Sequence, residues 1–402
     1  MVSPSLRALC VVLLHLARIG GFPLSSTESN GTTDWVLIPT VTGELVWTHP
    51  LVVEAQSRSW DMGESEIEFV FFSRRNSIGT ALKWNELHTL GNDTFVGMHP
   101  TRIIIHGWQN SRYSPINFNI RETYLIMWDY NIVVVDWSKC ALNWNYISAA
   151  SCVEIVGRTL ARVLVDLETT RGMSLDNVYL IGHSLGAHIA GIAGKYIPRG
   201  KVSTIVGLDP AFPLFYLDRP NNRVATGDAT YVEIIHTNGG ILGFRDPLGS
   251  ADFYPNGGIT QPGCGLNIGG LCSHSRSWKL FVESLLEPEE NLMAERIGSL
   301  GDLPAIGLNR IGRAKLGGEP SNAACGVLGL YYINTNDRSP YFGKHHRYLS
   351  QRRVRYTSLL AQREGVNQHA RPELNLNLQR LAPVENMSFD SVQMKSSSKT
   401  VV

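Results

Sequence analysis

The chain has 402 residues, long enough for one large domain or two smaller ones. Hydrophobic residues make up 43% and charged residues 18%, so we expect a globular core. The formal net charge is only +1, and no basic stripe with interleaved aromatic residues is present, so we expect no nucleic-acid partner.

The first 24 residues resemble a secretory signal peptide, with an approximate boundary. Arg7 supplies a positive charge, and residues 8–17 form an apolar run of about ten residues. That run is shorter than the ~20 residues that span a bilayer. A short uncleaved anchor or a buried helix is the alternative. No later apolar run approaches spanning length, so we expect a secreted, extracellular and soluble protein.

Residues 25–65 show no clear period, and we interpret them as a pro-segment or N-terminal arm. A single α/β domain is expected over residues 66–340, because short apolar strands there alternate with helical patterns. The predicted strands are 67–72, 102–105, 132–135, 178–181, 204–208, 231–235 and 328–334. The predicted helices are 152–167, 187–196 and 278–286.

Residues 341–402 change in composition, and we expect a disordered tail there. Residues 344–355 are basic, and the end of the chain is rich in Ser, Gln and Asn. We interpret the basic run as a solvated linker; binding of heparan-type polyanions or proteolytic processing are the alternatives.

Secretion permits disulfides and glycosylation. Five cysteines remain beyond the signal peptide, and two pairs close in sequence suggest the bridges Cys140–Cys152 and Cys264–Cys272, with Cys325 unpaired. Sequence alone does not fix the connectivity. The glycosylation sequons begin at Asn30, Asn92 and Asn386.

The pattern Gly182-His183-Ser184-Leu185-Gly186 lies between a predicted strand and a predicted helix. In that context a serine is held on a sharp turn that presents its hydroxyl at the carboxyl edge of the sheet. Glycines on both sides allow two backbones to pass closely. The pattern therefore predicts a nucleophile elbow with Ser184 as the nucleophile; an ordinary Gly-Ser turn is the alternative.

A serine nucleophile needs a base, and the base needs an orienting acid. In this class of site the chain order is Ser, then Asp or Glu, then His. Asp209 ends the next apolar strand, whereas Asp218 and Asp228 have no such position. We therefore predict Asp209 as the acid, although an Asp-Pro at a strand end is often only a turn.

Several histidines follow Asp209, and two of them precede the tail. His236 ends a strand and is expected near the site, in a supporting role. His274 follows Cys272 in what we interpret as a loop pinned before a helix. A catalytic imidazole must move between the nucleophile and the leaving group, so we predict His274 as the base.

The transition state carries an oxyanion that needs backbone donors. We predict the N–H groups of Leu185, next to the nucleophile, and of Trp108, in the loop after an early strand. His106 in the same loop is interpreted as a buried brace.

These residues resemble the pancreatic-lipase family, catalytic domain only. The matching stretches over roughly 70–340 are IIIHGW, VVDW, IGHSLGAHIAG, GLDPA, VEIIHTNGG, DFYPNGG and CSHSRSW. The resemblance implies an α/β-hydrolase fold, with a central and mostly parallel sheet flanked by helices. It also implies Ser184, Asp209 and His274 as the triad.

Three departures from the family pattern matter. The typical C-terminal β-sandwich is absent, so no colipase partner is expected. The lid between Cys264 and Cys272 holds only seven residues, and the loop 238–252 is also short, as in phospholipases A1 and some insect secreted lipases. Within the calcium loop, 220–228, Arg223 and Asp228 are kept, but Ala225 stands where a carboxylate is usual. We therefore predict no metal and no cofactor.

The sequence thus predicts a serine esterase that cleaves carboxylic ester bonds of lipids at a membrane, micelle or droplet surface. A triacylglycerol or broad lipase is favoured, and phospholipase A1 is the alternative. A short lid predicts an open site with little interfacial activation. A non-catalytic, lipid-binding or yolk-like storage protein is the alternative of another class. The oligomeric state is unknown from the sequence.

Overall fold

The computed structural model describes residues 35–58, 62–265, 269–305 and 312–343. From Val36 onward these residues belong to one compact unit. The predicted signal peptide, Asn30, Asn386 and the predicted tail beyond residue 343 lie outside the described residues. No described helix combines the length and the apolar character that crossing a membrane would need.

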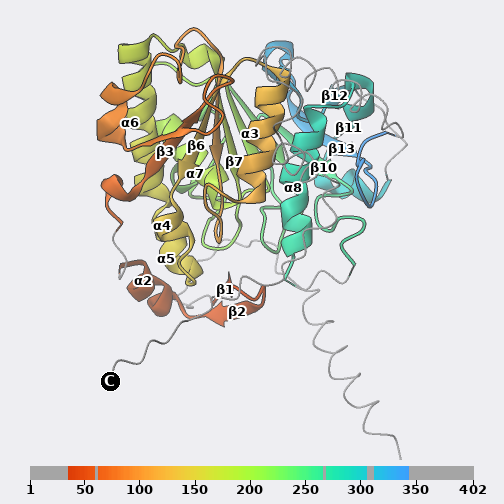
Figure 1. The fold of residues 1–402 in the computed structure, drawn as a ribbon. Helices are drawn as coiled ribbons and strands as arrows, with labels where there is room; N and C mark the ends of the chain where they lie inside the picture. Colours follow the sequence, from red (N-terminus) through yellow and green to blue (C-terminus); the bar gives the residue numbers. More distant parts are fainter. Residues whose placement is uncertain (1–34, 59–61, 266–268, 306–311, 344–402) are drawn as a thin grey trace, which may run out of the picture. The chain divides into compact units, whose positions relative to one another are not determined.

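One large sheet organises the fold (Figure 1). Its eleven strands run in the order β12-β11-β13-β10-β9-β8-β7-β5-β6-β3-β4. The seven neighbouring strands β13-β10-β9-β8-β7-β5-β6 pair in parallel. At the two margins, β3 and β4 on one side and β11 and β12 on the other pair in antiparallel fashion. The strands are β3 (Glu68–Phe72), β4 (Thr80–Leu82), β5 (Thr101–Ile105), β6 (Asn131–Asp136), β7 (Val178–His183), β8 (Thr204–Leu208), β9 (Tyr231–Ile235), β10 (Ala251–Pro255), β11 (Met293–Ile297), β12 (Arg313–Lys315) and β13 (Gly329–Ile333).

The parallel arrangement decides where a site can form. The carboxyl ends of the parallel strands meet at one edge of the sheet, and the loops that follow them lie together there. These strands are buried on both faces, which explains their almost unbroken runs of Ile, Val and Leu.

Helices cover both faces of the sheet. α6 (Val153–Arg171) and α7 (Leu185–Tyr196) pack with one set of strand side chains, and α3 (Pro115–Met127) and α8 (Leu271–Ser284) pack with the other (Figure 1). The sheet is therefore the middle layer of three. α6 ends at Gly172, whose φ of 67° is left-handed and suits glycine at a helix end.

Shorter elements connect these layers. The helices are α2 (Pro50–Arg58), α4 (Ser138–Ala141) and α5 (Tyr146–Ser151). The 3-10 turns are η1 (Glu64–Glu66), η2 (Trp84–Thr89), η3 (Leu175–Asn177), η4 (Pro220–Asn222), η5 (Glu289–Leu292), η6 (Leu300–Ala305) and η7 (Asn322–Cys325). Disulfides join Cys140 to Cys152 and Cys264 to Cys272, as predicted, and Cys325 is a free, exposed thiol.

The predicted α/β-hydrolase architecture and all the predicted strands are present, with ends within about two residues. The prediction missed α3, α4, α5, β4, β10, β11 and β12. It was also wrong about the start of the last helix, because α8 begins at Leu271 and not at Trp278. Its first turn carries Cys, Ser and His and lacks the apolar spacing that identifies a helix.

The predicted arm, residues 25–65, is partly described and has regular structure. β1 (Val36–Pro39) and β2 (Leu45–Thr48) form an antiparallel hairpin, and α2 follows. Ile38 is buried and belongs to the core cluster. Asn92, the sequon within the described residues, is exposed, and its side-chain oxygen accepts a hydrogen bond from Arg171.

Candidate active site

Ser184 lies directly after β7 and directly before α7, at the carboxyl edge of the sheet. Its φ of 57° and ψ of −122° are unusual for a residue with a side chain. Such a conformation is strained and persists where the surrounding structure imposes it. Here the Ser184 N–H donates to the carbonyl of Leu208, 3.0 Å away, so β8 fixes the turn.

The two glycines of the elbow are sterically required. A Cβ on Gly182 would lie 2.2 Å from the carbonyl oxygen of Gly186. A Cβ on Gly186 would lie 2.2 Å from the carbonyl oxygen of Ile105 in β5. The glycine spacing therefore lets the start of α7 pass directly against the neighbouring strand.

Asp209 follows β8, at the same edge, and is fully buried. Its Oδ2 lies 2.6 Å from Nδ1 of His274. Its Oδ1 accepts hydrogen bonds from the backbone N–H groups of Thr237, at 2.7 Å, and Asn238, at 3.0 Å. The carboxylate is held from one side by backbone donors and faces the imidazole with its other oxygen.

His274 lies in the first turn of α8, so the prediction that it occupies a loop was wrong. Its N–H donates to the carbonyl of Gly270, at 2.8 Å, as in a helix. Gly270, the N-cap residue just before the helix, has a left-handed φ of 78°. The imidazole is therefore positioned by a helix start tethered through Cys272.

His183 connects the histidine to the elbow. Its ring centroid is 4.6 Å from that of His274, and its Nε2 lies 3.2 Å from the His274 carbonyl oxygen. Because His183 immediately precedes Ser184, this contact brings His274 to the elbow. Burial lowers the pKa of His183 well below its usual value, and charge on His274 would lower it further. His183 is therefore neutral at pH 7.

The loop after β5 passes against Ser184. A Cβ on Gly107 would lie only 2.8 Å from Cβ of Ser184. Trp108 is next in the chain; its indole Nε1 donates to the Asn143 carbonyl at 2.7 Å. The same ring meets Tyr146 edge-on, with centroids 5.2 Å apart. The backbone around Trp108 is thus held beside the nucleophile position.

Leu185 is the first residue of α7, and it is fully buried. The N–H groups of a first helical turn have no acceptor within the helix. The N–H of Leu185 is therefore available, by position, for an oxyanion at Ser184. The positive end of the helix dipole favours negative charge at the same place.

A buried group of polar side chains supports the β5 loop, and the sequence interpretation identified only His106 in it. Nε2 of His106 lies 3.5 Å from Asp136, and the Arg112 guanidinium lies 2.7 Å from the same carboxylate. Trp137 stacks on His106 and donates to its carbonyl at 2.9 Å. Burial alone would raise the pKa of Asp136, but the His106 ring and the Ser138 hydrogen bond hold it below its usual range.

His236, the alternative base, has other partners. Its Nε2 lies 2.8 Å from Asp252 and its Nδ1 lies 2.7 Å from the carbonyl of Phe244. Its ring stacks on Tyr254, with centroids 4.4 Å apart. His236 therefore ties β9 to β10 beneath the site, which agrees with a supporting role.

The residues in the position of the family's calcium loop, 220–228, have partners within the chain. The ammonium of Lys195, on α7, forms an ion pair with Oδ1 of Asp228, and the Ala225 N–H donates to Oδ2 at 2.8 Å. The Arg223 guanidinium donates to the carbonyls of Tyr216, Leu217 and Val224. Calcium binds six to eight oxygen ligands. Both oxygens of the Asp228 carboxylate already accept hydrogen bonds from donors of the chain. Nowhere in the described ranges do three or more His, Cys, Asp or Glu side chains group as a metal would require.

The cysteine bridge of the predicted lid is present, but residues 266–268 lie outside the described residues. Arg276, one turn beyond the bridge in α8, donates to the carbonyl of Pro262 at 2.9 Å. The base of the short segment is therefore tied to α8.

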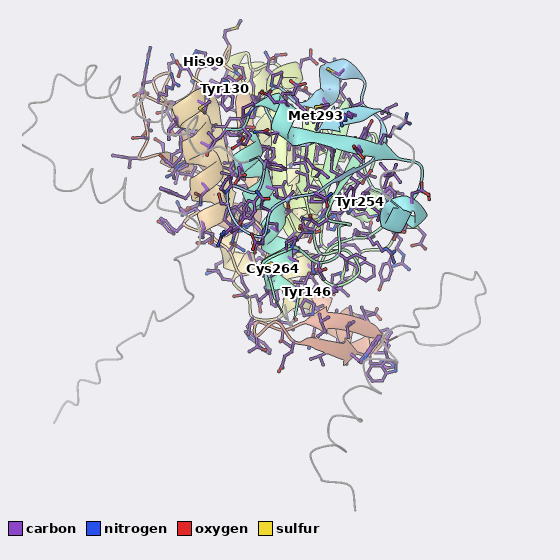
Figure 2. All side chains as sticks on the ribbon, turned by 90° about the vertical axis from the view of Figure 1, so that its right-hand side faces the viewer. His99, Tyr130, Tyr146, Tyr254, Cys264 and Met293 are labelled. Atoms are coloured by element: carbon purple, nitrogen blue, oxygen red, sulfur yellow. A yellow bond between two sulfur atoms is a disulfide. The ribbon has the colours of Figure 1, made fainter. Side chains whose placement is uncertain are left out.

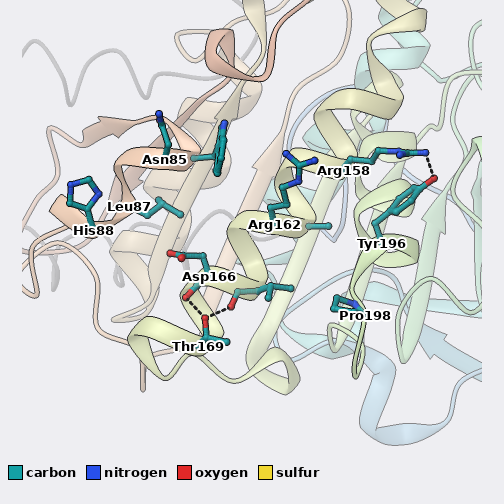
Figure 3. A pocket seen from close by; sticks show the side chains of 12 residues that line it. Asn85, Leu87, His88, Arg158, Arg162, Asp166, Thr169, Tyr196 and Pro198 are labelled. Carbon is teal, nitrogen blue, oxygen red and sulfur yellow. Dashed lines mark hydrogen bonds between the residues drawn. The ribbon is translucent and has the colours of Figure 1, made fainter.

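A cavity of about 750 Å³ lies away from the triad, between η2 and α6 (Figure 3). Arg158 and Tyr196 are hydrogen-bonded across one side of it, and Trp84 contributes to its wall. None of its lining residues belongs to the predicted triad or oxyanion hole, so it is a separate feature.

The family model described as Lipase matches residues 39–341. Lipase member H from Oryctolagus cuniculus is 33% identical over 284 residues, which cover 68% of this chain and 59% of that protein. Pancreatic triacylglycerol lipase from Mus musculus is 32% identical over 264 residues, which cover 60% of this chain and 56% of that protein.

Hepatic triacylglycerol lipase from Oryctolagus cuniculus is 35% identical over 258 residues, covering 56% of this chain and 50% of that protein. The chain spans about half the length of the curated relatives it matches. Among solved structures, the esterase PE8 aligns over 36% of this chain and 69% of its own, with a TM-score of 0.27 and 16% identity.

Proposed function

The chain belongs to the lipase family, the same family that the sequence motifs resemble, and we propose that it is a secreted serine hydrolase of lipid esters. The single observation that carries the proposal is the 2.6 Å contact between Asp209 and His274 beside a serine on a strained elbow. A storage or carrier protein would have no need of this costly arrangement.

In the proposed reaction, the Asp209 carboxylate accepts a hydrogen bond from Nδ1–H of His274, which keeps that proton on Nδ1 and leaves Nε2 free as the base. Nε2 takes the proton of Ser184 Oγ as that oxygen attacks the ester carbonyl. The same proton then goes to the departing alcohol, and an acyl-enzyme remains. Water, activated by His274, releases the fatty acid.

The oxyanion of each tetrahedral intermediate is stabilised by the N–H groups of Leu185 and Trp108. Losing one such donor typically costs about 10²–10³ in rate. The packing of Trp108 on Tyr146 and its bond to Asn143 keep the second donor in place before substrate arrives. The proposed reaction uses no metal ion or cofactor. The Lys195 ammonium neutralises Asp228, the carboxylate kept in the calcium-loop stretch.

For the substrate we favour triacylglycerols or a broad range of lipid esters, since two of the matching relatives are named triacylglycerol lipases. Phospholipase A1 is the second candidate, favoured by the seven residues between Cys264 and Cys272. The two disulfides are compatible with secretion, because such bonds persist in oxidising compartments.

The test uses the purified full chain on triolein and on phosphatidylcholine, with Ser184→Ala as the matched control. We expect hydrolysis by the wild-type protein and a loss of about 10⁶ in the variant. Equal activity of the two proteins would refute the mechanism. The ratio of the two product yields assigns the substrate class, and no activity on either lipid would favour the carrier alternative.

A further inference from the structure

The β1–β2 hairpin stands apart from the main sheet as a two-stranded sheet of its own. Ile38 on β1 anchors it in the core, with 7% exposed. The outer strand has no such burial, because Val46 is 47% exposed and Trp47 is 60% exposed. Val41, in the connecting turn, is 49% exposed. Large apolar side chains thus face solvent along a firmly attached element.

A chain of close contacts places this hairpin beside the triad. A Cβ on Gly269 would lie 1.8 Å from the Gly43 carbonyl oxygen, so the hairpin turn abuts the segment that leads into α8. A Cβ on Gly270 would lie 2.2 Å from Oδ1 of Asn238, whose N–H donates to Asp209. The hairpin lies at the carboxyl edge of the sheet in Figure 1, below α5, with which β1 is in contact, and Tyr146 of α5 is labelled directly above it in Figure 2.

Other segments at this edge are apolar and exposed as well. β1 contacts α5, and the loop that leads into α5 carries Leu142, 53% exposed, and Trp144, 77% exposed. Leu271, at the start of α8, is 51% exposed, and Phe212, just after Asp209, is 40% exposed. Each lies close in the chain to a group of the candidate site: Leu142 and Trp144 flank Asn143, which accepts a hydrogen bond from Trp108. Leu271 lies about one turn before His274 in α8, and Phe212 lies three residues after Asp209.

Charge is sparse in the same segments. Glu44 is the one ionisable residue in the sequence of 36–48, and 142–145 has none. Surfaces that bind proteins or anions normally carry charged or hydrogen-bonding rims. An apolar face with a tryptophan and few charges matches the boundary between water and acyl chains, where indole rings partition favourably.

We propose that the β1–β2 hairpin is a lipid-surface anchor that seats the aggregated ester substrate over the triad, with Trp47 entering the acyl-chain boundary. The proposal rests on the proposed function, because it names the physical form in which that site meets its substrate. The hairpin would then make the contact with the lipid surface that the seven residues between Cys264 and Cys272 are too few to make. The anchored β1 strand gives the outer strand β2 a rigid base.

The experiment compares the wild-type full chain with Trp47→Ser and with Val46→Ser/Trp47→Ser. Binding is measured by flotation with phosphatidylcholine vesicles, and hydrolysis is measured on emulsified triolein and on a soluble short-chain ester. We expect vesicle binding to fall about tenfold to a hundredfold, as transfer of one aromatic side chain implies. The apparent KM on the emulsion rises accordingly, while turnover of the soluble ester is unchanged.

Ile78→Ser is the matched control. Ile78 is 92% exposed and follows the end of β3. That end of β3 lies beside the start of β6, since Phe72 pairs with Ile132. Ile78 therefore lies at the amino edge of the parallel strands, opposite the triad. We expect this variant to bind vesicles as the wild type does. Trp47→Phe should restore most of the binding, and a thermal melt of each variant identifies any that has failed to fold.

Unchanged vesicle binding by Val46→Ser/Trp47→Ser would overturn the proposal. A change of oligomeric state in that variant with unchanged vesicle binding would also overturn it, in favour of a second copy of the chain as the occupant. The proposal would also be overturned if Ile78→Ser lost vesicle binding to the same extent as Val46→Ser/Trp47→Ser. A wild-type protein that hydrolyses neither the soluble ester nor the emulsion refutes the proposed function instead, whatever its vesicle binding.

Discussion

Gly243 offers a way to disturb the orienting acid without touching the triad. A Cβ at this position would lie 2.4 Å, 2.5 Å and 2.5 Å from the three terminal atoms of the Asp209 carboxylate. The backbone φ of Gly243 is outside the left-handed range. Gly243→Ala therefore adds steric pressure on the Asp209 carboxylate, which supplies the three atoms nearest to the added Cβ.

The size of the effect follows from these distances. Ordinary contact begins at 3.4 Å, so the carboxylate must shift by about 1 Å. Its bond to His274 is 2.6 Å long and does not survive such a shift in good geometry. A 1 Å misplacement costs about 10² in rate, and the loss of the acid's function costs about 10⁴. We expect kcat to fall between these limits.

The assay is hydrolysis of a soluble short-chain ester, which separates chemistry from lipid binding. The matched control is Gly63→Ala, where the nearest atom to an added Cβ is 3.6 Å away. That variant should retain wild-type kcat. Wild-type kcat in a folded Gly243→Ala protein would refute the reasoning that Asp209 orients the base.

Three further predictions concern stability. Burial raises the pKa of Glu233 to about 7, against the hydrogen bonds that favour its charged form, so the unfolded chain loses this proton first as pH rises. The contribution of Glu233 to the free energy of unfolding is full below about pH 4.5 and falls by about 3 kcal/mol as pH rises through 7. Urea denaturation at pH 5 and pH 8 should therefore show a smaller loss of stability with rising pH in Glu233→Gln than in the wild type. An equal loss in both proteins would contradict this. Lys195→Met strands the buried Asp228 carboxylate and should lower Tm by about 5 °C. Calcium or EDTA should leave the wild-type Tm unchanged, and a rise in Tm with calcium would refute the prediction that the chain binds no calcium.

The elbow and the acid could be predicted from sequence because both depend on short-range signals. An apolar strand, two glycines around Ser184 and a small-residue helix occupy neighbouring positions in the chain. Asp209 follows from the rule that parallel strands end at one edge. The same rule placed the loop containing Trp108.

The remaining features depend on contacts between distant parts of the chain. Lys195 and Asp228 are 33 residues apart, and nothing in either neighbourhood announces the pair. The hairpin escaped prediction because β2 is exposed on both faces and has no alternating pattern. The start of α8 at Leu271 is set by Gly270 and the tether at Cys272, and its polar first turn concealed the helix.

Covalent capture tests the central claim most directly. A long-chain alkyl phosphonate ester mimics the tetrahedral intermediate, and it should react with one equivalent of protein with loss of its leaving group. We predict that mass spectrometry of the digested protein places the adduct on Ser184 and that His274→Gln abolishes labelling. An unlabelled wild-type protein, or an adduct on another residue, would contradict the assignment of Ser184 as the nucleophile.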